Sequence, residues 1–285
     1  MSTQSLTHSM KARKRVSHLV IYLILIFFSI IALFPFAWMI SASLKFNTQV
    51  FIYPIDWIPE NPQWGNYLAV FQEFDFLRYF GNTAFVAITI TIGTLLTSVL
   101  AAYAFAKLNF RGRDKIFLLY IATLMIPWQV IMIPQFLIVN GFHLNNSHWG
   151  LIVTQIFSPF GVFLLKQFFM GIPLEYTEAA KIDGCSHPRI CFQIIVPMAK
   201  PALTTLILLT FMGAWNDYLA PLIYLRDEKL RTLQIGLHYF QGENETQWAL
   251  LMAGAFMSMI PVLLLYIFAQ KQLIEGMASA GGLKG

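Results

Sequence analysis

Six long runs of apolar residues, separated by polar segments, dominate the pattern along this chain. They cover about Leu19–Ile40, Asn82–Ala106, Ile116–Val139, Gly150–Phe169, Ala202–Tyr224 and Trp248–Ala269. Each run is close to the ~20 residues that an α-helix needs to cross the hydrocarbon core of a bilayer. The pattern predicts an all-α polytopic membrane protein with six transmembrane helices in residues 19–270. Residues 1–18 then form an N-terminal segment and residues 271–285 a C-terminal tail that its small residues predict to be flexible.

Composition and charge agree with a membrane protein. Hydrophobic residues make up 57% of the chain, charged residues only 12%, and the mean hydropathy is +0.62, which excludes an ordinary soluble domain. The net charge of +5 does not indicate a nucleic-acid partner, because the basic residues lie at the ends of the predicted spans. With six spans, fourteen of the nineteen Lys and Arg residues fall on the side of the N-terminus. The positive-inside rule therefore predicts that both termini are cytosolic.

Two segments are predicted on the outer side. The first, Ser41–Phe80, contains three prolines and two tryptophans near its middle, which indicates an extended strip near the lipid headgroups, followed by a short amphipathic helix at about Asn66–Phe74. It could form a lid over the outer mouth or simply pack at the interface, and packing is the simpler interpretation for most of its residues. The second segment, Arg226–Gln247, is a charged polar loop.

The most informative polar segment is Glu175–Pro201, on the predicted cytosolic side between the fourth and fifth spans. Gly184 stands where a glycine would end a first short helix. Ser186 and Pro188 then read as the N-cap and first turn of a second helix, which Pro197 is expected to end.

A helix of about ten residues is marginal by itself in water, so the first of these helices must pack on something. Ala179 and Ala180 would leave a shallow groove for another protein, whereas Glu178, Lys181 and Asp183 mark a wet or interface-facing side. From the residues alone, a solvated loop that caps the bundle and a docking element for a partner are equally good interpretations.

Several polar residues lie inside the predicted spans. Gln129 and Gln135 adjoin two prolines in the third span, and Asn216 and Asp217 lie in the outer part of the fifth. Prolines bend helices and free carbonyls, which is tolerated where the backbone is buried or lines a wet cavity. These four residues are candidates for lining a solute path, with structural hydrogen bonding as an equal alternative. The hydroxyl and glycine residues of the second span, by contrast, are expected to be packing contacts: Thr89, Thr91, Gly93, Thr94, Thr97 and Ser98.

No catalytic residues are predicted, because the chain has no phosphate-binding loop, no HExxH motif and no paired acids near a histidine. No metal site is predicted either, since His143 and His148 share one loop without a third ligand. Cys185 and Cys191 lie on the predicted cytosolic side and are expected to be free thiols.

The 173–201 loop resembles the EAA loop of ABC-importer permeases. The matching residues are Glu178-Ala179-Ala180, then Gly184 four positions later, then Ile194–Pro197. Val196 stands where that family usually has Leu, a change of similar volume. The rest of the chain is similar to maltose-type carbohydrate permeases at shorter patterns: Ser43-Leu44-Lys45, Trp57-Ile58-Pro59, Asn66-Tyr67, Trp215-Asn216-Asp217 and the C-terminal tail.

The resemblance implies a non-catalytic permease subunit of a prokaryotic cell (inner/plasma) membrane. It implies a second permease subunit, two ATPase subunits that bind ATP and Mg²⁺, an extracellular solute-binding protein and a carbohydrate substrate, with no cofactor held by this chain. The helix in the loop would be a cytosolic coupling helix that sits in a cleft of one ATPase. The residues implied in coupling are Glu178, Ala179, Ala180, Asp183, Gly184 and Pro197.

Other functions remain open at this point. A permease for glycerol-phosphate or another polyol would carry the same loop. An ion-coupled secondary transporter would usually have more ionisable residues in the membrane than Asp217, and a signalling or scaffold protein would need no solute path.

Overall fold

The computed structural model describes residues 3–242 and 245–282, and its regular structure there is helical apart from one isolated β-bridge between Gln241 and Thr246. The chain divides into two compact units. The first contains residues up to Glu73 together with Phe240–Met257, and the second contains Phe74–Tyr239 together with the residues from Ser258 onward. The predicted all-α membrane fold is confirmed, and each unit is described separately below.

The first unit holds the predicted outer strip and short helix. Its helices are α1 (Thr3–Ser43), η1 (Asn47–Gln49), α2 (Gly65–Glu73) and the beginning of α14 (Trp248–Gly282). Asn47 joins distant parts of this unit, because its side-chain amide donates to Glu245 Oε1 at 3.0 Å and to the Thr246 carbonyl at 3.1 Å. Asn66 similarly donates to the carbonyls of Ser43 and Lys45, both at 2.9 Å. These amide contacts explain how a segment with little regular structure stays ordered.

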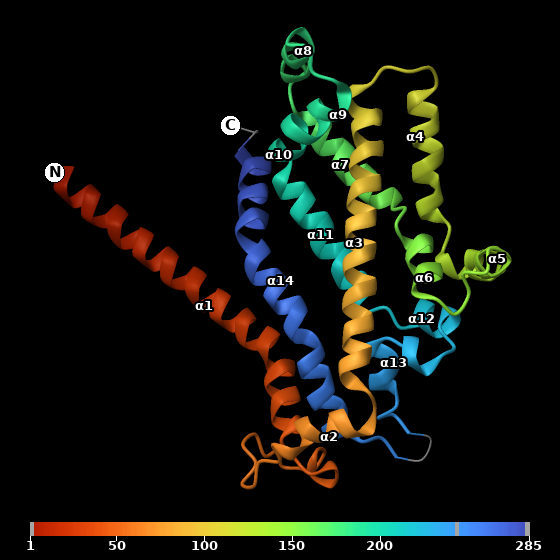
Figure 1. Cartoon of the computed structure of the whole chain (residues 1–285). Helices are drawn as coiled ribbons and strands as arrows, with labels where there is room; N and C mark the ends of the chain where they lie inside the picture. The colour runs from red at the N-terminus through yellow and green to blue at the C-terminus, as the bar shows by residue number, and fades with distance from the viewer. Residues whose placement is uncertain (1–2, 243–244, 283–285) are drawn as a thin grey trace. The chain divides into compact units, whose positions relative to one another are not determined.

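The second unit is built around α3 (Phe76–Lys107), against which α7 and α11 pack (Figure 1). Its other elements are α4 (Arg113–Ala122), η2 (Thr123–Met125), α5 (Trp128–Gly141), α6 (His148–Gln155), α7 (Pro159–Gly171), α8 (Leu174–Ile182), α9 (His187–Ile190), the π-helix η3 (Cys191–Ile195), α10 (Val196–Met198), α11 (Lys200–Trp215), α12 (Leu219–Tyr224), η4 (Glu228–Leu230) and α13 (Leu233–His238). Gly161 allows α7 to approach its neighbours closely, since a Cβ there would lie 2.6 Å from Ser98 Oγ. Small residues thus bring these helices together, as expected in a membrane.

Among the described residues, three helices are long and apolar enough to cross a membrane by themselves, and up to six spans result if each of three bent helix pairs counts as one. The predicted third span is not a single helix, because α4–η2 and α5 meet at 102°. Pro127 disfavours helical backbone at the preceding residue, and Ile126 is extended there, with φ −86° and ψ 113°. The predicted fourth span is also bent, by 42° between α6 and α7.

The predicted fifth span, Ala202–Tyr224, is also interrupted. α11 ends at Trp215, and α12 begins at Leu219 after a three-residue break. The Asp217 carboxylate accepts the N–H of Ala220 at 3.2 Å, the local bonding by which Asp favours helix starts over helix interiors. The acid therefore lies between two helices and not within a continuous span.

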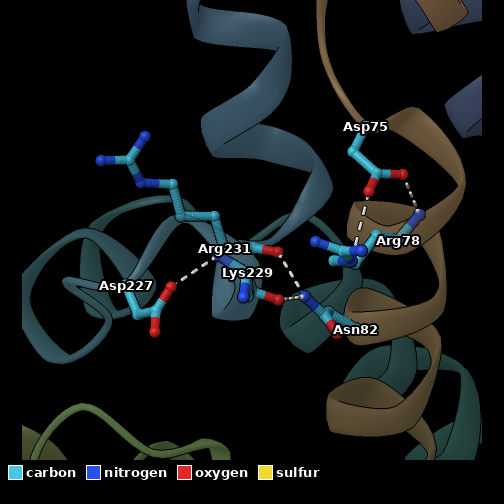
Figure 2. A network of polar contacts seen from close by, with 6 residues as sticks. All are labelled: Asp75, Arg78, Asn82, Asp227, Lys229 and Arg231. Atoms are coloured by element: carbon cyan, nitrogen blue, oxygen red, sulfur yellow. Dashed lines mark hydrogen bonds and ion pairs between the residues drawn. The ribbon is translucent and has the colours of Figure 1, made fainter.

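The predicted polar loop Arg226–Gln247 contains a short buried helix, α13. Leu233, Ile235 and Leu237 are buried in α13, which packs against the Phe76 end of α3. The side-chain amide of Asn82 donates to the carbonyls of Lys229 and Arg231, both at 2.9 Å (Figure 2). Leu233, Ile235 and Leu237 are apolar at alternate positions, a pattern by which the sequence could have indicated that they are buried.

The C-terminal residues continue a helix, since α14 runs to Gly282. The flexible tail predicted from composition is helical over 271–282, because Ala, Leu, Met, Gln and Lys are good helix formers and outweigh the glycines in this stretch. Residues 283–285, the last part of the predicted tail, lie outside the described residues.

Candidate coupling loop and translocation groove

The turn at Gly184 has the geometry that the sequence predicted. Gly184 has φ +78°, its N–H donates to the Lys181 carbonyl at 3.0 Å, and the Cys185 N–H donates to the Ala180 carbonyl at 2.9 Å. This pair of bonds is the Schellman ending of an α-helix, in which the residue after the C-cap adopts left-handed backbone. A side chain at Gly184 would meet no atom within 4 Å, so its requirement for glycine comes from the backbone angle alone.

The second half of the loop begins as predicted but does not end where predicted. Ser186 is the N-cap of α9, with extended backbone and no side-chain capping bond. Pro197 lies inside α10, and the helical path continues to Met198 before it turns by 85° into α11. Proline is tolerated there because the π-helix immediately before it already interrupts the regular hydrogen-bond ladder.

The two neighbouring alanines of the loop face different ways. Ala179 is exposed, whereas Ala180 is 6% exposed and Thr177 is 2% exposed. Ala180 packs into a cluster of the protein's own residues. The prediction of a groove shared by both alanines is therefore wrong: the i, i+3 pair Thr177 and Ala180 seats α8 on the bundle, and Ala179 remains available to a partner.

The cluster that contains Ala180 connects the 173–201 loop to three long helices. The loop contributes Ile190, Cys191 and Ile195, each at most 1% exposed. Burying an Ile side chain contributes about 1.5–3 kcal/mol, so the loop is held by several kcal/mol. The helices contribute residues from the end of α3 (Val99, Ala102, Tyr103), from α7 (Leu165, Phe169) and from α11 (Ala202, Leu203, Leu206).

Two polar contacts strengthen this attachment. Lys107, the last residue of α3, is 8% exposed and donates from Nζ to the Ile172 carbonyl at 2.6 Å, where α7 ends. Tyr103 OH lies 3.0 Å from His187 Nδ1 at the beginning of α9. Both contacts join the end of α3 to the two sides of the 173–201 loop, so a displacement of the loop would be transmitted to α3.

The outward face of α8 combines apolar and charged residues. Leu174, Tyr176 and Ile182 are 56%, 51% and 87% exposed, and Glu178 and Asp183 are also exposed. α8 lies at the tip of one end of the second unit (Figure 1). Exposed Ile and Tyr beside carboxylates are typical of a protein-binding surface. No motif in the sequence marks Ile182, although its place one residue before the C-cap could have indicated exposure.

A groove of about 250 Å³ lies near the middle of α3, at the break between α6 and α7. We call it the central groove. Its polar wall includes Thr94, Gln155, Ser158 and Thr210, and its remaining lining residues are Ile90, Phe160, Leu209, Gly213 and Ala214. A mixed apolar and hydroxyl lining at this depth suits a solute that exchanges hydrogen bonds with water.

The hydroxyls of α3 satisfy the backbone at this break. Thr97 Oγ1 donates to the Ile156 carbonyl at 2.6 Å, and Thr94 Oγ1 donates to the Gln155 carbonyl at 3.3 Å. Non-helical backbone at membrane depth requires such partners. The predicted packing role of the second-span hydroxyls is therefore confirmed at Thr94 and Thr97, and Thr94 additionally lines the central groove.

The four predicted path residues are not brought together. Gln129 is exposed on α5, and Gln135 accepts from Trp128 Nε1 at 2.9 Å within the same helix. Asn216 is exposed and donates to the Met212 carbonyl at 2.9 Å. None of the four lines the central groove. Asp217 contacts one of its lining residues, since Asp217 Oδ2 accepts from Gln155 Nε2 at 3.0 Å.

Over the described parts of the chain, no three His, Cys, Asp or Glu residues come together in a way that could hold a metal ion. Cys185 and Cys191 are free, as predicted, with Cys191 buried and Cys185 partly exposed.

The long apolar helices, the EAA-type loop and the buried cluster define a membrane permease of the ABC-importer type. The chain belongs to the family described as the binding-protein-dependent transport system inner membrane component, which residues 93–277 match. It is thus a multi-pass membrane protein and a transport component.

Particular relatives agree with this family. The chain is 34% identical over 262 residues to the arabinooligosaccharides transport system permease protein AraQ of Halalkalibacterium halodurans, covering 91% of this chain and 94% of AraQ. It is 35% identical to the sulfoquinovosyl glycerol transport system permease protein SmoH of Agrobacterium fabrum, covering 89% of each. Among solved structures, a chain of a bacterial ABC transporter involved in the import of the acidic polysaccharide alginate matches with a TM-score of 0.79 and 26% identity, covering 91% of this chain and 97% of that one.

Proposed function

We propose that this chain is one of two permease subunits of an ATP-driven importer for an oligosaccharide, and that α8 is the element that an ATPase subunit holds. The observation that carries the proposal is the buried cluster that joins the 173–201 loop to α3, α7 and α11. A loop attached in this way moves the membrane helices when a partner moves it.

The proposed partners follow from the family and from what this chain lacks. The family is named for its dependence on a binding protein, so an extracellular solute-binding protein is proposed as one partner. A second permease subunit would complete the solute path, because the central groove is an open groove on a single bundle. Two ATPase subunits would bind ATP with Mg²⁺, while this chain holds no cofactor and catalyses no reaction.

The proposed orientation places the 173–201 loop and both termini in the cytosol of a prokaryotic cell. Its support is the distribution of Lys and Arg, fourteen of which fall on that side. The structure adds a length argument. Asn82 and Tyr103 are 21 residues apart on α3, or about 31 Å at 1.5 Å per residue, which is the thickness of the hydrocarbon core. The polar loops anchored at the two ends of α3 would thus lie on opposite sides.

The proposed mechanism is alternating access driven by rigid-body motion. Closure of the ATPase pair would displace α8, with Ala179 and Ile182 in contact with the ATPase and Glu178 and Asp183 as polar contacts. Ala180 and Gly184 would act indirectly, by seating and ending the helix. The cluster would pass the displacement to α3, α7 and α11, and the central groove would change the side to which it opens.

A carbohydrate is proposed as the substrate because similar permeases are named for arabinooligosaccharides and sulfoquinovosyl glycerol. A glycerol-phosphate substrate is the second candidate, since the chain is also 32% identical over 257 residues to the sn-glycerol-3-phosphate permease UgpE of Pectobacterium atrosepticum.

The test is uptake by proteoliposomes that contain the purified complex and an added binding protein. We expect labelled oligosaccharide to accumulate only with ATP inside, and to do so unchanged when an ionophore collapses the proton and sodium gradients. Uptake that continues without ATP and follows an ion gradient would refute the proposal in favour of a secondary transporter.

A further inference from the structure

A second pocket lies near the beginning of α13, at the end of the second unit that is farthest from α8. It has a volume of about 330 Å³, and its lining includes Tyr218, Arg226, Arg231, Ile235, His238 and Tyr239. We call it the arginine pocket. It is separate from the central groove, with which it shares no lining residue.

The pocket combines positive charge with aromatic faces. Within the described part of the chain no Asp or Glu lines it, and neither Arg226 nor Arg231 makes a salt bridge. The Arg231 guanidinium carbon lies 5.5 Å from the centre of the Tyr239 ring. The rings of Tyr218 and His238 lie 5.2 Å apart at 54° and form a second aromatic surface.

The backbone that carries the two arginines is held firmly from outside the pocket. Asn146 Oδ1 accepts from the N–H groups of Arg226 and Asp227 at 2.9 and 2.8 Å, and Asn82 binds the Arg231 carbonyl at 2.9 Å. The neighbouring Asp227 accepts from the Lys229 N–H at 2.9 Å within its own turn. Figure 2 shows the Arg231 guanidinium pointing away from Asn82 and from the Asp75–Arg78 ion pair. The backbone at both arginines is thus ordered, while neither guanidinium forms an ion pair among the described residues.

These features match one kind of ligand. A guanidinium binds a carboxylate through two parallel N–H···O bonds, and an ordered site loses little entropy on binding. Aromatic faces beside the arginines suit the C–H face of a sugar ring. An isolated carboxylate from a protein side chain would use the charge but not the three rings, and a neutral sugar would leave both guanidinium groups unpaired.

We propose that the arginine pocket binds a carboxylated sugar unit, such as a hexuronate of an oligosaccharide, on the side of the membrane opposite to the 173–201 loop. The inference rests on the proposed function, because it names a substrate class for the same importer. The pocket would hold an acidic glycan at the outer side, at the end of α3 farthest from the loop that drives transport.

The experiment measures binding of digalacturonate to the full-length chain, purified with its membrane partners but without a binding protein, by titration calorimetry. The methyl ester of digalacturonate has the same rings without the charge and is the matched ligand. We expect the acid to bind at least tenfold more tightly than the ester. We also expect Arg226→Gln and Arg231→Gln each to weaken binding of the acid at least tenfold.

Lys229→Gln is the matched control, because it removes the same charge from the same loop at a residue that does not line the pocket. Its binding should stay within twofold of the unaltered chain, and all three variants should keep the same unfolding temperature, since each leaves the backbone clamps intact. Equal binding of acid and ester, or equal losses in Lys229→Gln and Arg231→Gln, would overturn the inference. Binding of an acidic peptide in place of digalacturonate would overturn it as well and would assign the pocket to a protein partner. ATP-driven uptake of any oligosaccharide by the unaltered complex tests the proposed function separately.

Discussion

The left-handed turn at Gly184 allows a graded test of the loop, because its substitution is costly for one reason only. A Cβ at this position meets no atom within 4 Å, and the backbone has φ +78°. An alanine in this conformation costs about 1–2 kcal/mol, and a β-branched residue costs more. Since 1–2 kcal/mol corresponds to a factor of roughly 5–30, Gly184→Ala should reduce the population of the correctly turned loop by up to that factor.

Asparagine tolerates this backbone region better than other non-glycine residues, so transport should fall in the order Gly, Asn, Ala, Val. The assay is ATP-dependent uptake in proteoliposomes, normalised to the amount of assembled complex. Membrane insertion of all variants should be unchanged, because the six apolar runs are unaltered.

Gly171→Ala is the matched control for this series. Gly171 also has open space around a Cβ but has no positive φ, so alanine there should be neutral or slightly stabilising. Normal transport by an assembled Gly184→Val complex would refute the argument that this turn positions α8.

Three further predictions concern the contacts that hold the bundle. Thr97→Val should lower the free energy of unfolding by about 1–3 kcal/mol, because it leaves the Ile156 carbonyl at the α6–α7 break without its hydrogen bond. Ser98→Ala is the control and should be nearly neutral, since Ser98 Oγ has no partner among the described residues. Equal thermal stability of the two variants would contradict this prediction. Lys107→Met should lower the free energy of unfolding by about 1–3 kcal/mol, because it removes the hydrogen bond to the Ile172 carbonyl at the end of α7. ATP-dependent uptake should fall more than the amount of assembled complex in the membrane. Full uptake by this variant would argue against the prediction. A maleimide should label Cys185 and spare Cys191 until the chain is unfolded, because Cys191 is 1% exposed, and mass spectrometry showing equal labelling in the native state would count against the packing.

The turn and the helix starts of the 173–201 loop could be predicted because their signals are local. A helix-ending glycine and a helix-starting serine–proline pair act through the backbone within a few residues, and both lie where the sequence placed them. The direction of Ala180 could not be predicted in the same way. Ala179 and Ala180 are the same residue type, and only the contact with α3, α7 and α11 decides that Ala180 is the buried one.

The path residues were harder to predict for a related reason. Glutamine beside proline in an apolar run indicates a polar contact, but it does not identify the partner. Gln135 accepts from Trp128 of its own helix and donates to the Thr154 carbonyl of α6. The central groove instead forms at the α6–α7 break, beside Ser158, because a groove depends on which helices meet.

The proposed coupling requires contact between α8 and an ATPase, and cross-linking measures that contact directly. A cysteine is placed at Ile182, which is 87% exposed, in a chain where Cys185 is replaced by Ser. A cysteine at Ile58, which is 83% exposed in the predicted outer strip, is the control. With a short bifunctional reagent, Ile182→Cys should form a product with the co-purifying ATPase, at a yield that changes on addition of ATP, and Ile58→Cys should form none. Absence of an ATPase product from Ile182→Cys in an active complex would contradict the account.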